Sequence, residues 1–230
     1  MNTNSWDPVW EKIFNEQEWG KYPSESLIQF VARNFYKSER PKIKILEVGC
    51  GTGANIWYIS REGFDVYGID GSVTAVEKAR ERIENEKLKA ELIIGDIVKL
   101  PYENSFFDVV IDNECLYANT LDSTLSIIKE ISRVLKPEGK FYSRTFSDKM
   151  YIGKSQKSIA YNEFTNISDG PLANKGFVRL TSEKDIEIIY GSAFEVLSVD
   201  TLKHTSYNRS LFTSEWVIVC KNKVQILVNE

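Results

Sequence analysis

The sequence of 230 residues contains little histidine and little cysteine. Its one histidine is His204, and its three cysteines, Cys50, Cys115 and Cys220, lie far apart along the chain. An odd number of widely separated cysteines does not form a disulfide framework, and a zinc site needs closely spaced cysteine or histidine ligands. We therefore expect no metal site and no disulfide scaffold, and we expect the protein to be cytoplasmic.

Long apolar runs and clusters of basic residues are missing as well. No stretch approaches the roughly 20 apolar residues that a membrane-spanning helix needs, and the first residues do not resemble a signal peptide. The net charge is −4, and the 29 lysines and arginines are scattered rather than gathered in a stripe. Because binding to nucleic-acid phosphates requires a concentrated basic face, we expect no nucleic-acid partner and no membrane span. The oligomeric state does not follow from the sequence.

Apolar runs and amphipathic segments alternate between residues 42 and 146. The runs have the length of strands that are buried on both faces, and the segments between them have the 3.6-residue period of helices. The expected strands cover 42–48, 64–70, 90–96, 106–112 and 139–146, and the expected helices cover 54–63, 72–86 and 121–135. This alternation predicts an α/β fold with a doubly wound, mostly parallel sheet and helices on both faces.

The flanking segments extend this pattern on both sides. Residues 24–36 predict a helix with Ser24 as its N-cap. Its expected buried face, and that of the helix at 72–86, consist of Leu27, Ile28, Val31 and Phe35, and of Val73, Val76, Ala79 and Ile83. Towards the C-terminus, residues 181–191 predict a last helix, and 193–204 and 210–221 predict an antiparallel hairpin at the sheet edge.

Three glycines, Gly49, Gly51 and Gly53, stand where the first strand ends and the first helix begins. Glycine weakens a strand, so another requirement must place it there, either unusual backbone dihedrals or close approach of a ligand. The position is the crevice at the carboxyl end of a doubly wound sheet, where ligands bind. The sequence therefore predicts a ligand site at this loop.

Acidic residues end the next two strands. Asp70 is placed to accept hydrogen bonds from ribose hydroxyls, and Asp96 to accept one from the exocyclic amine of an adenine that Ile97 would cover. Taken alone, Asp96 is equally typical of a turn or a helix cap, whereas the position of Asp70 favours a binding role over a turn. Together with the glycine loop they favour a nucleoside.

Two classes of ligand fit a glycine loop followed by an acid. Gly49, Gly51 and Ala54 satisfy a loose dinucleotide fingerprint, which leaves an NAD-dependent oxidoreductase as an alternative. The additional Gly53, and Glu47 inside the strand end, are not typical of that fingerprint. A non-catalytic regulator that binds a cofactor is a further alternative.

Five segments stand in order between residues 43 and 146: ILEVGCGTG, VYGIDGS, IIGDI, FFDVVIDNECLY and RVLKPEGKF. They are similar to the successive motifs of class I (seven-stranded, Rossmann-like) S-adenosylmethionine-dependent methyltransferases of the small-molecule branch. The resemblance implies a seven-stranded sheet with an antiparallel last strand, S-adenosyl-L-methionine as cofactor and S-adenosyl-L-homocysteine as product. The cofactor-binding residues that it implies are Glu47, Gly49, Cys50, Gly51, Thr52, Gly53, Asp70, Gly71, Ser72, Gly95, Asp96, Ile97, Asp112 and Asn113.

The acceptor side is less well defined. The resemblance places Glu114 and Tyr117 near the point of methyl transfer, where many relatives carry histidines and this chain does not. With His204 they are the candidate catalytic residues, because a hydroxyl acceptor needs a base whereas an amine must only arrive uncharged. Trp10, Trp19 and Tyr22 are candidates for a lid over the substrate, although they are equally consistent with a helix that packs its aromatic residues on the domain.

These expectations combine into one domain over residues 1–230. It comprises an N-terminal helical cap (1–40), a cofactor-binding core (43–146), a lid insertion (147–176) that lacks a regular period, and a last helix with an edge hairpin (177–230). The expected function is methyl transfer to a small-molecule acceptor, to oxygen before nitrogen or carbon, with a sugar or other polar metabolite as the first hypothesis. The alternatives within the class are a quinone-like ring, a protein or tRNA.

Overall fold

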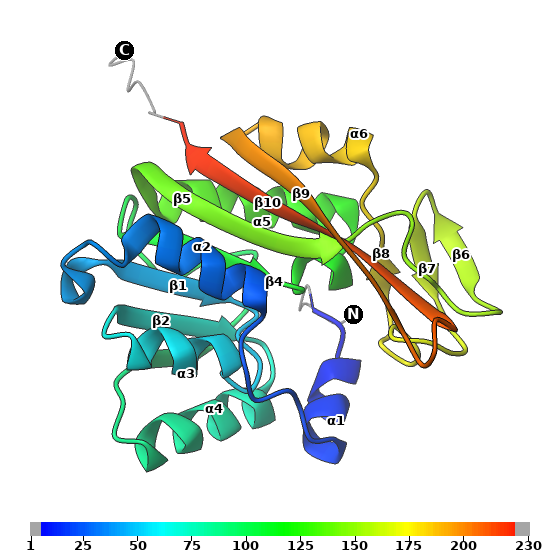
Figure 1. Cartoon of the computed structure of the whole chain (residues 1–230), viewed down its shortest axis with the longest axis horizontal. Coiled ribbons are helices and arrows are strands. Elements are labelled where there is room, and N and C mark those ends of the chain that lie inside the picture. The colour runs from blue at the N-terminus through cyan, green and yellow to red at the C-terminus, as the bar shows by residue number, and fades with distance from the viewer. Residues whose placement is uncertain (1–5, 224–230) are drawn as a thin grey trace.

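The computed structural model describes residues 6–223; residues 1–5 and 224–230, the outer ends of the expected cap and hairpin segments, lie outside the described part (Figure 1). Seven strands form one sheet in the order β3-β2-β1-β4-β5-β10-β9. The helical elements are α1 (Val9–Glu16), α2 (Glu25–Phe35), η1 (Arg40–Lys42), α3 (Ala54–Arg61), α4 (Val73–Asn85), η2 (Leu116–Ala118), α5 (Leu121–Val134), α6 (Glu183–Ile186) and η3 (Glu187–Gly191). The strands are β1 (Lys44–Val48), β2 (Asp65–Asp70), β3 (Glu91–Ile94), β4 (Phe107–Asn113), β5 (Leu135–Phe146), β6 (Lys157–Ala160), β7 (Glu163–Thr165), β8 (Val178–Arg179), β9 (Phe194–Ser206) and β10 (Leu211–Asn222).

The sheet is mostly parallel. Strands β3, β2, β1, β4 and β5 pair in parallel, whereas β10 runs antiparallel to both β5 and β9. The long hairpin of β9 and β10 thus closes one edge of the sheet, as Figure 1 shows in orange and red. The expected fold class, with its antiparallel last strand, is confirmed.

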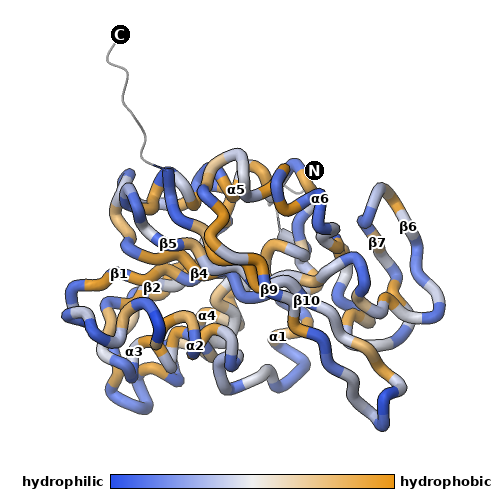
Figure 2. Tube along the Cα trace, turned by 45° about the horizontal axis from the view of Figure 1, so that its top comes forward, coloured by the Kyte–Doolittle hydropathy of each residue, from blue (hydrophilic) through white to orange (hydrophobic). Residues whose placement is uncertain are grey.

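Alternate residues of the central strands enter two separate cores. Ile45 of β1 and Tyr142 of β5 pack against α2, α3 and α4, and their neighbours Leu46 and Phe141 pack with α5 and the α6–η3 segment on the other face. Figure 2 shows the resulting concentration of hydrophobic residues in the central strands and of hydrophilic ones along the outer loops. Helices on both faces explain why these strands are apolar at nearly every position.

The helix faces agree with the expectation except at two positions. Ile28 and Val73 are 36% and 45% exposed, and Phe30 is buried instead, against Phe35 and Tyr142. Ile28 directly follows the fully buried Leu27, so the two side chains point about 100° apart around the helix. The helix starts are as expected. The Ser24 and Ser72 hydroxyls each accept a hydrogen bond from the backbone amide three residues later in the chain.

The 147–176 segment differs from the irregular structure that its sequence predicts. It contributes β6 and β7, which pair with β8 in a separate three-stranded antiparallel sheet. Apolar residues of the segment, among them Met150, Ile167 and Leu172, form a third core with Tyr117 and Phe146. Strands of two to four residues are too short to show a period in the sequence.

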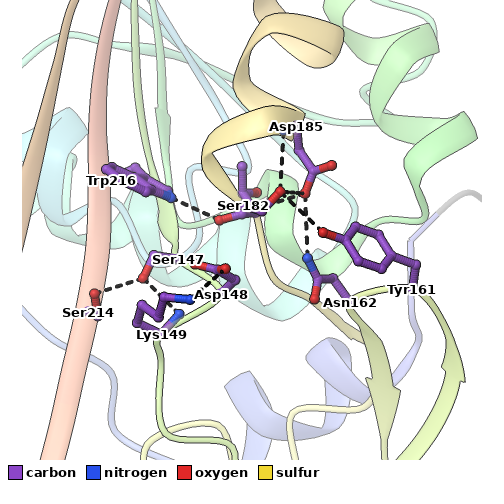
Figure 3. A network of polar contacts seen from close by, with 10 residues as sticks. Ser147, Asp148, Lys149, Tyr161, Asn162, Ser182, Asp185, Ser214 and Trp216 are labelled. Carbon is purple, nitrogen blue, oxygen red and sulfur yellow. Dashed lines mark hydrogen bonds and ion pairs between the residues drawn. The ribbon is translucent and has the colours of Figure 1, made fainter.

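Hydrogen bonds attach this small sheet to the main one (Figure 3). The Ser147 hydroxyl donates to the Ser214 hydroxyl of β10 over 2.7 Å, and Trp216 Nε1 donates to the carbonyl oxygen of Thr181 over 2.8 Å. Figure 3 also shows Tyr161 and Asn162 pointing at Ser182 and Asp185, which form the capping box at the start of α6. The chain from Ser147 to Thr181 is therefore anchored at both ends, and its apolar residues pack against Tyr117.

Candidate functional site

A cavity of about 160 Å³ lies at the carboxyl ends of the parallel strands. Its walls come from the loops after β1, β2, β3 and β4, from η2, and from the N-terminal segment around α1. The lining residues are Trp6, Asp7, Trp10, Phe14, Trp19, Gly49, Asp70, Gly71, Gly95, Ile97, Asn113, Glu114, Cys115, Tyr117, Ala118 and Asn119. Residues expected on the cofactor side and residues expected on the acceptor side thus share one cavity.

Glycine is needed in this loop for two reasons, the backbone conformation and the close approach of neighbouring side chains. Gly49 and Gly53 have φ angles of +66° and +79°, in the left-handed region that favours glycine. A Cβ atom at Gly49 would collide with the Cys115 side chain, and one at Gly53 would lie 2.9 Å from the Ala79 Cβ. The absence of a side chain at Gly49 and Gly53 therefore lets Cys115 and Ala79 pack directly against the loop backbone. Gly49 also lines the cavity.

Asp70 presents a buried carboxylate to this cavity. One of its oxygens accepts a hydrogen bond from Gly51 N and the other from Ser72 N, both over 2.8 Å. Burial raises the pKa of Asp70, and these two amide hydrogen bonds partly offset the rise. Each carboxylate oxygen retains a lone pair, so the group can still accept two hydroxyl donors from a ligand.

Glu47 lies beneath the glycine loop rather than on the cavity lining. One carboxylate oxygen accepts a hydrogen bond from Asn55 Nδ2 over 2.6 Å, and the other, Oε2, has no partner within residues 6–223. Burial raises the pKa of Glu47 to about 8, although the Asn55 amide lowers it. The side chain therefore supports the loop from behind, and Asn55 is a supporting residue that the sequence analysis missed.

Asp112 fixes the chain after β4. Its Oδ1 accepts hydrogen bonds from Cys115 N over 2.9 Å and Leu116 N over 3.1 Å, and its Oδ2 accepts one from the Ser143 hydroxyl. Burial raises the pKa of Asp112 to about 6, while the Ser143 hydrogen bond lowers it. Asp112 is thus a positioning residue, and its neighbour Asn113 lines the cavity instead.

Glu114 lies at the edge of the cavity in a strained backbone conformation. Its φ angle is +61°, and its carboxylate lies 3.1 Å from Arg144 Nη1. Arg144 also pairs with the buried Glu215, so one guanidinium serves two carboxylates. Burial raises the pKa of Glu114 to about 7, although Arg144 lowers it. A carboxylate with this pKa can take up a proton near neutral pH.

Aromatic side chains form the roof and one wall. Trp10, Phe14 and Trp19 contact one another at ring-centroid distances of 5.4–5.8 Å, and Trp10 meets Tyr117 edge-on at 6.3 Å. Tyr117 packs on Phe146 and is buried, and burial raises the pKa of its phenol. The phenol therefore stays protonated at neutral pH and is not itself a base.

The N-terminal segment also contacts the part of the cavity that follows β2, where a nucleoside is expected. A Cβ atom at Gly71 would lie 2.5 Å from Trp6 Cε2, so the indole ring lies directly on this glycine. Glu11 accepts hydrogen bonds from the Ser72 hydroxyl and from the Thr74 hydroxyl and amide, at the start of α4. A carboxylate there is stabilised by the helix dipole. This segment therefore spans both halves of the cavity.

Two predicted site residues lie elsewhere. His204 is exposed on β9, opposite Thr213, and lines a separate groove that Glu114 and Arg144 also border. Tyr22 is 77% exposed and rests edge-on against Trp57 of α3. The hairpin carries His204 away from the cavity lining, so it is not retained as a base, and Tyr22 is not retained as part of a lid.

The other predicted cofactor residues fall into two groups. Gly49, Asp70, Gly71, Gly95, Ile97 and Asn113 line the cavity. The remaining residues are not among those that line the cavity: Glu47, Cys50, Gly51, Thr52, Gly53, Ser72, Asp96 and Asp112. Asp96 accepts a hydrogen bond from Val98 N over 3.1 Å, which is the turn role that its sequence position also allowed.

Sequence analysis missed six of the lining residues: Trp6, Asp7, Phe14, Cys115, Ala118 and Asn119. The four-residue spacing of Trp10 and Phe14 was an available signal for one helical face, whereas Trp6 lies before the start of α1. The place of Asn119 in the cavity could not be predicted from the local sequence, because Arg179, which binds its carbonyl oxygen, is 60 residues away. In the described range 6–223, no helix is long and apolar enough to cross a membrane, and no cluster of three or more metal-binding side chains occurs.

Comparison with known proteins identifies relatives of this chain. A family model described as a methyltransferase domain matches residues 39–202. A demethylmenaquinone methyltransferase of Bacillus mycoides (strain KBAB4) is 30% identical over 188 residues, which cover 76% of this chain and 74% of the relative.

Solved structures show the same fold. An S-adenosylmethionine-dependent methyltransferase of Methanosarcina mazei superposes with a TM-score of 0.71 at 20% identity, covering 88% of this chain and 99% of the other. Magnesium protoporphyrin IX methyltransferase of Synechocystis PCC 6803, solved with bound S-adenosylmethionine, gives a TM-score of 0.62 at 14% identity and covers 94% and 80%.

Proposed function

Because the chain belongs to the class I S-adenosylmethionine-dependent methyltransferase family, we propose that it methylates a small molecule bound beside Glu114 and Tyr117. The observation that carries this proposal is the single cavity, which Gly49 and Asp70 line on one side and Glu114 and Tyr117 on the other. The family membership sets aside the NAD-dependent oxidoreductase and the non-catalytic regulator.

The cavity residues fit the cofactor. Asp70 offers a buried carboxylate with free lone pairs, which suits the two hydroxyls of a ribose. Gly95 and Ile97 provide a flat, apolar edge for an adenine, and Gly49 lets the amino-acid end approach the backbone. S-adenosylmethionine supplies a methyl group that is already activated by the sulfonium, so the protein mainly aligns the reactants and excludes water.

Oxygen is the proposed acceptor atom. The Glu114 carboxylate borders the cavity and is held by Arg144, so it is placed to take the proton from an acceptor hydroxyl. Tyr117, as a protonated phenol, positions the acceptor by donating a hydrogen bond. A polar metabolite such as a sugar is compatible with these groups, and transfer to an uncharged amine nitrogen would need no base at Glu114.

A ring-shaped acceptor is the second candidate, and a specific observation favours it. Four aromatic residues of the lining (Trp10, Phe14, Trp19 and Tyr117) surround the acceptor side, and aromatic walls bind flat rings well. The relative named as a demethylmenaquinone methyltransferase is consistent with a quinone-like ring.

Transfer of an isotope-labelled methyl group tests the proposal. The protein is incubated with methyl-labelled S-adenosylmethionine and cell extract, and the extract is then separated into metabolites and macromolecules. We expect label in one or a few metabolites, because the cavity under the aromatic roof has a small volume of about 160 Å³. Label that enters only protein or tRNA would contradict the small-molecule acceptor.

A further inference from the structure

Two polar atoms of the cavity lining are buried without a hydrogen-bond partner among residues 6–223. They are Trp10 Nε1, which is a donor only, and Asn119 Oδ1, which is an acceptor only. Buried polar groups in folded proteins are nearly always paired, so an unpaired donor and an unpaired acceptor in one cavity need an explanation. A bound molecule that offers both complementary groups provides one.

The orientation of the Asn119 amide is fixed by its neighbours. Its Nδ2 donates to the carbonyl oxygen of Cys115 over 3.1 Å, and because that oxygen only accepts, the reversed amide would face it with a second acceptor. Asn119 is only 4% exposed, and its own carbonyl oxygen accepts a hydrogen bond from Arg179 Nε over 3.2 Å. Side chain and backbone are thus held from two directions, and Oδ1 is left without a partner among residues 6–223.

The Trp10 ring is held just as firmly. Its centroid lies 5.7 Å from that of Phe14, 5.8 Å from that of Trp19 and 6.3 Å from that of Tyr117. Buried tryptophan N–H groups usually find a partner, and this one lines a cavity with apolar aromatic walls.

Both atoms belong to the acceptor side rather than the nucleoside side. Asn119 follows η2 after β4, whereas Asp70, Gly95 and Ile97 follow β2 and β3. In the sheet order β3-β2-β1-β4, strand β1 separates the two sets. A ligand at Asn119 therefore lies beyond the glycine loop, next to Tyr117 and Glu114.

We propose that Trp10 Nε1 and Asn119 Oδ1 form a specificity subsite for a neutral, flat amide-like or lactam-like group of the acceptor. The acceptor's carbonyl oxygen receives the hydrogen bond from Trp10, and its N–H or O–H donates to Asn119. Both protein groups are uncharged, and one donates while the other accepts, which is the complement of a neutral amide or lactam group. This inference rests on the proposed function and narrows its acceptor to molecules with an acceptor and a donor on one flat group.

Binding of small probes to the protein saturated with S-adenosylhomocysteine tests the subsite. The probes are 2-pyridone, which has a carbonyl and an adjacent N–H, N-methyl-2-pyridone, which lacks the donor, and toluene, which lacks both. Dissociation constants from ligand-observed NMR should be on the order of millimolar for 2-pyridone. We expect N-methyl-2-pyridone and toluene to bind at least about tenfold more weakly.

Three variants identify the atoms responsible. Trp10→Phe keeps the ring and removes the donor to the carbonyl oxygen, so it should reduce the preference for 2-pyridone over toluene. Asn119→Ala removes the acceptor of the probe's N–H, so it should abolish the preference for 2-pyridone over N-methyl-2-pyridone. Tyr102→Phe is the matched control, because the Tyr102 hydroxyl is also buried and unpaired in the described chain but lies outside the cavity. This control should keep the preference unchanged.

The outcomes separate the two proposals. Equal binding of 2-pyridone and N-methyl-2-pyridone to the wild type, no binding of 2-pyridone at all, or an unchanged preference for 2-pyridone over toluene in Trp10→Phe would each overturn the subsite. These comparisons hold even if Asn119→Ala fails to fold. Failure of the wild type to bind S-adenosylhomocysteine would instead count against the cofactor site on which the proposed function depends.

Discussion

At the residue scale, Asp70 is the carboxylate on which cofactor binding depends most. We expect Asp70→Asn to weaken binding of S-adenosylhomocysteine by about tenfold to a hundredfold, because charge-assisted hydrogen bonds are worth roughly 1.5–3 kcal/mol. The amide oxygen of the variant can still accept one of the two backbone hydrogen bonds, so the loop should keep its shape.

Isothermal titration calorimetry measures this effect, and Asp65→Asn at the opposite end of β2 is the control. Unchanged affinity in a folded Asp70→Asn variant would show that Asp70 only shapes the turn.

Glu47 should make the free energy of unfolding fall as the pH rises. Its pKa in the folded state is about 8, above its ordinary value of 4.5. Below about pH 4.5 both states are protonated, and as the pH rises towards 8 the unfolded state ionises first, so the stability contribution of the neutral carboxyl is lost. Glu47→Gln cannot ionise and should lose less stability between pH 5 and pH 8, by on the order of a few kcal/mol.

Urea unfolding at pH 5 and pH 8 tests this, with the exposed Glu77→Gln of α4 as a control. Parallel pH profiles for the wild type and Glu47→Gln would mean that Glu47 ionises in the folded protein as easily as in the unfolded one.

At the element scale, the N-terminal helix α1 is held over the cavity by contacts with α4. Glu11 binds Ser72 and Thr74 at the start of α4, and the Lys78 side chain donates to the carbonyl oxygen of Phe14 at the other end of α1. We expect Glu11→Ala to release α1, raise its amide hydrogen exchange, and weaken S-adenosylhomocysteine binding, because Trp6 leaves Gly71.

Glu16→Ala, an exposed position on the same helix, should change neither property. Unaltered exchange and affinity in Glu11→Ala would show that the aromatic contacts alone hold α1.

The helices and strands differ in how well the sequence predicts them. The strands and helices between residues 42 and 146 were predictable, because burial on two faces and helical periodicity leave strong local patterns. The sheet of β6, β7 and β8 was not, since its strands have two to four residues. The cofactor side of the site lies at strand ends and could be located, whereas Asn119 and the position of His204 depend on packing between distant segments.

At the scale of the whole molecule, Glu114 lies between two hollows and lines both of them. One is the aromatic-roofed cavity at the carboxyl ends of the strands, and the other is the groove along the β9–β10 hairpin that His204 lines. We propose that methyl transfer takes place in the cavity with Glu114 as the base, and that His204 takes no part in the reaction.

The rate of labelled methyl transfer into extract metabolites by Glu114→Gln and by His204→Ala tests this claim most directly. Glu114→Gln should lower the rate by about a hundredfold or more, since general-base catalysis contributes roughly 10²–10⁴-fold, while S-adenosylhomocysteine affinity stays near that of the wild type. His204→Ala should transfer label at the wild-type rate. Full activity in Glu114→Gln together with a large loss in His204→Ala would contradict the account and place the acceptor in the hairpin groove.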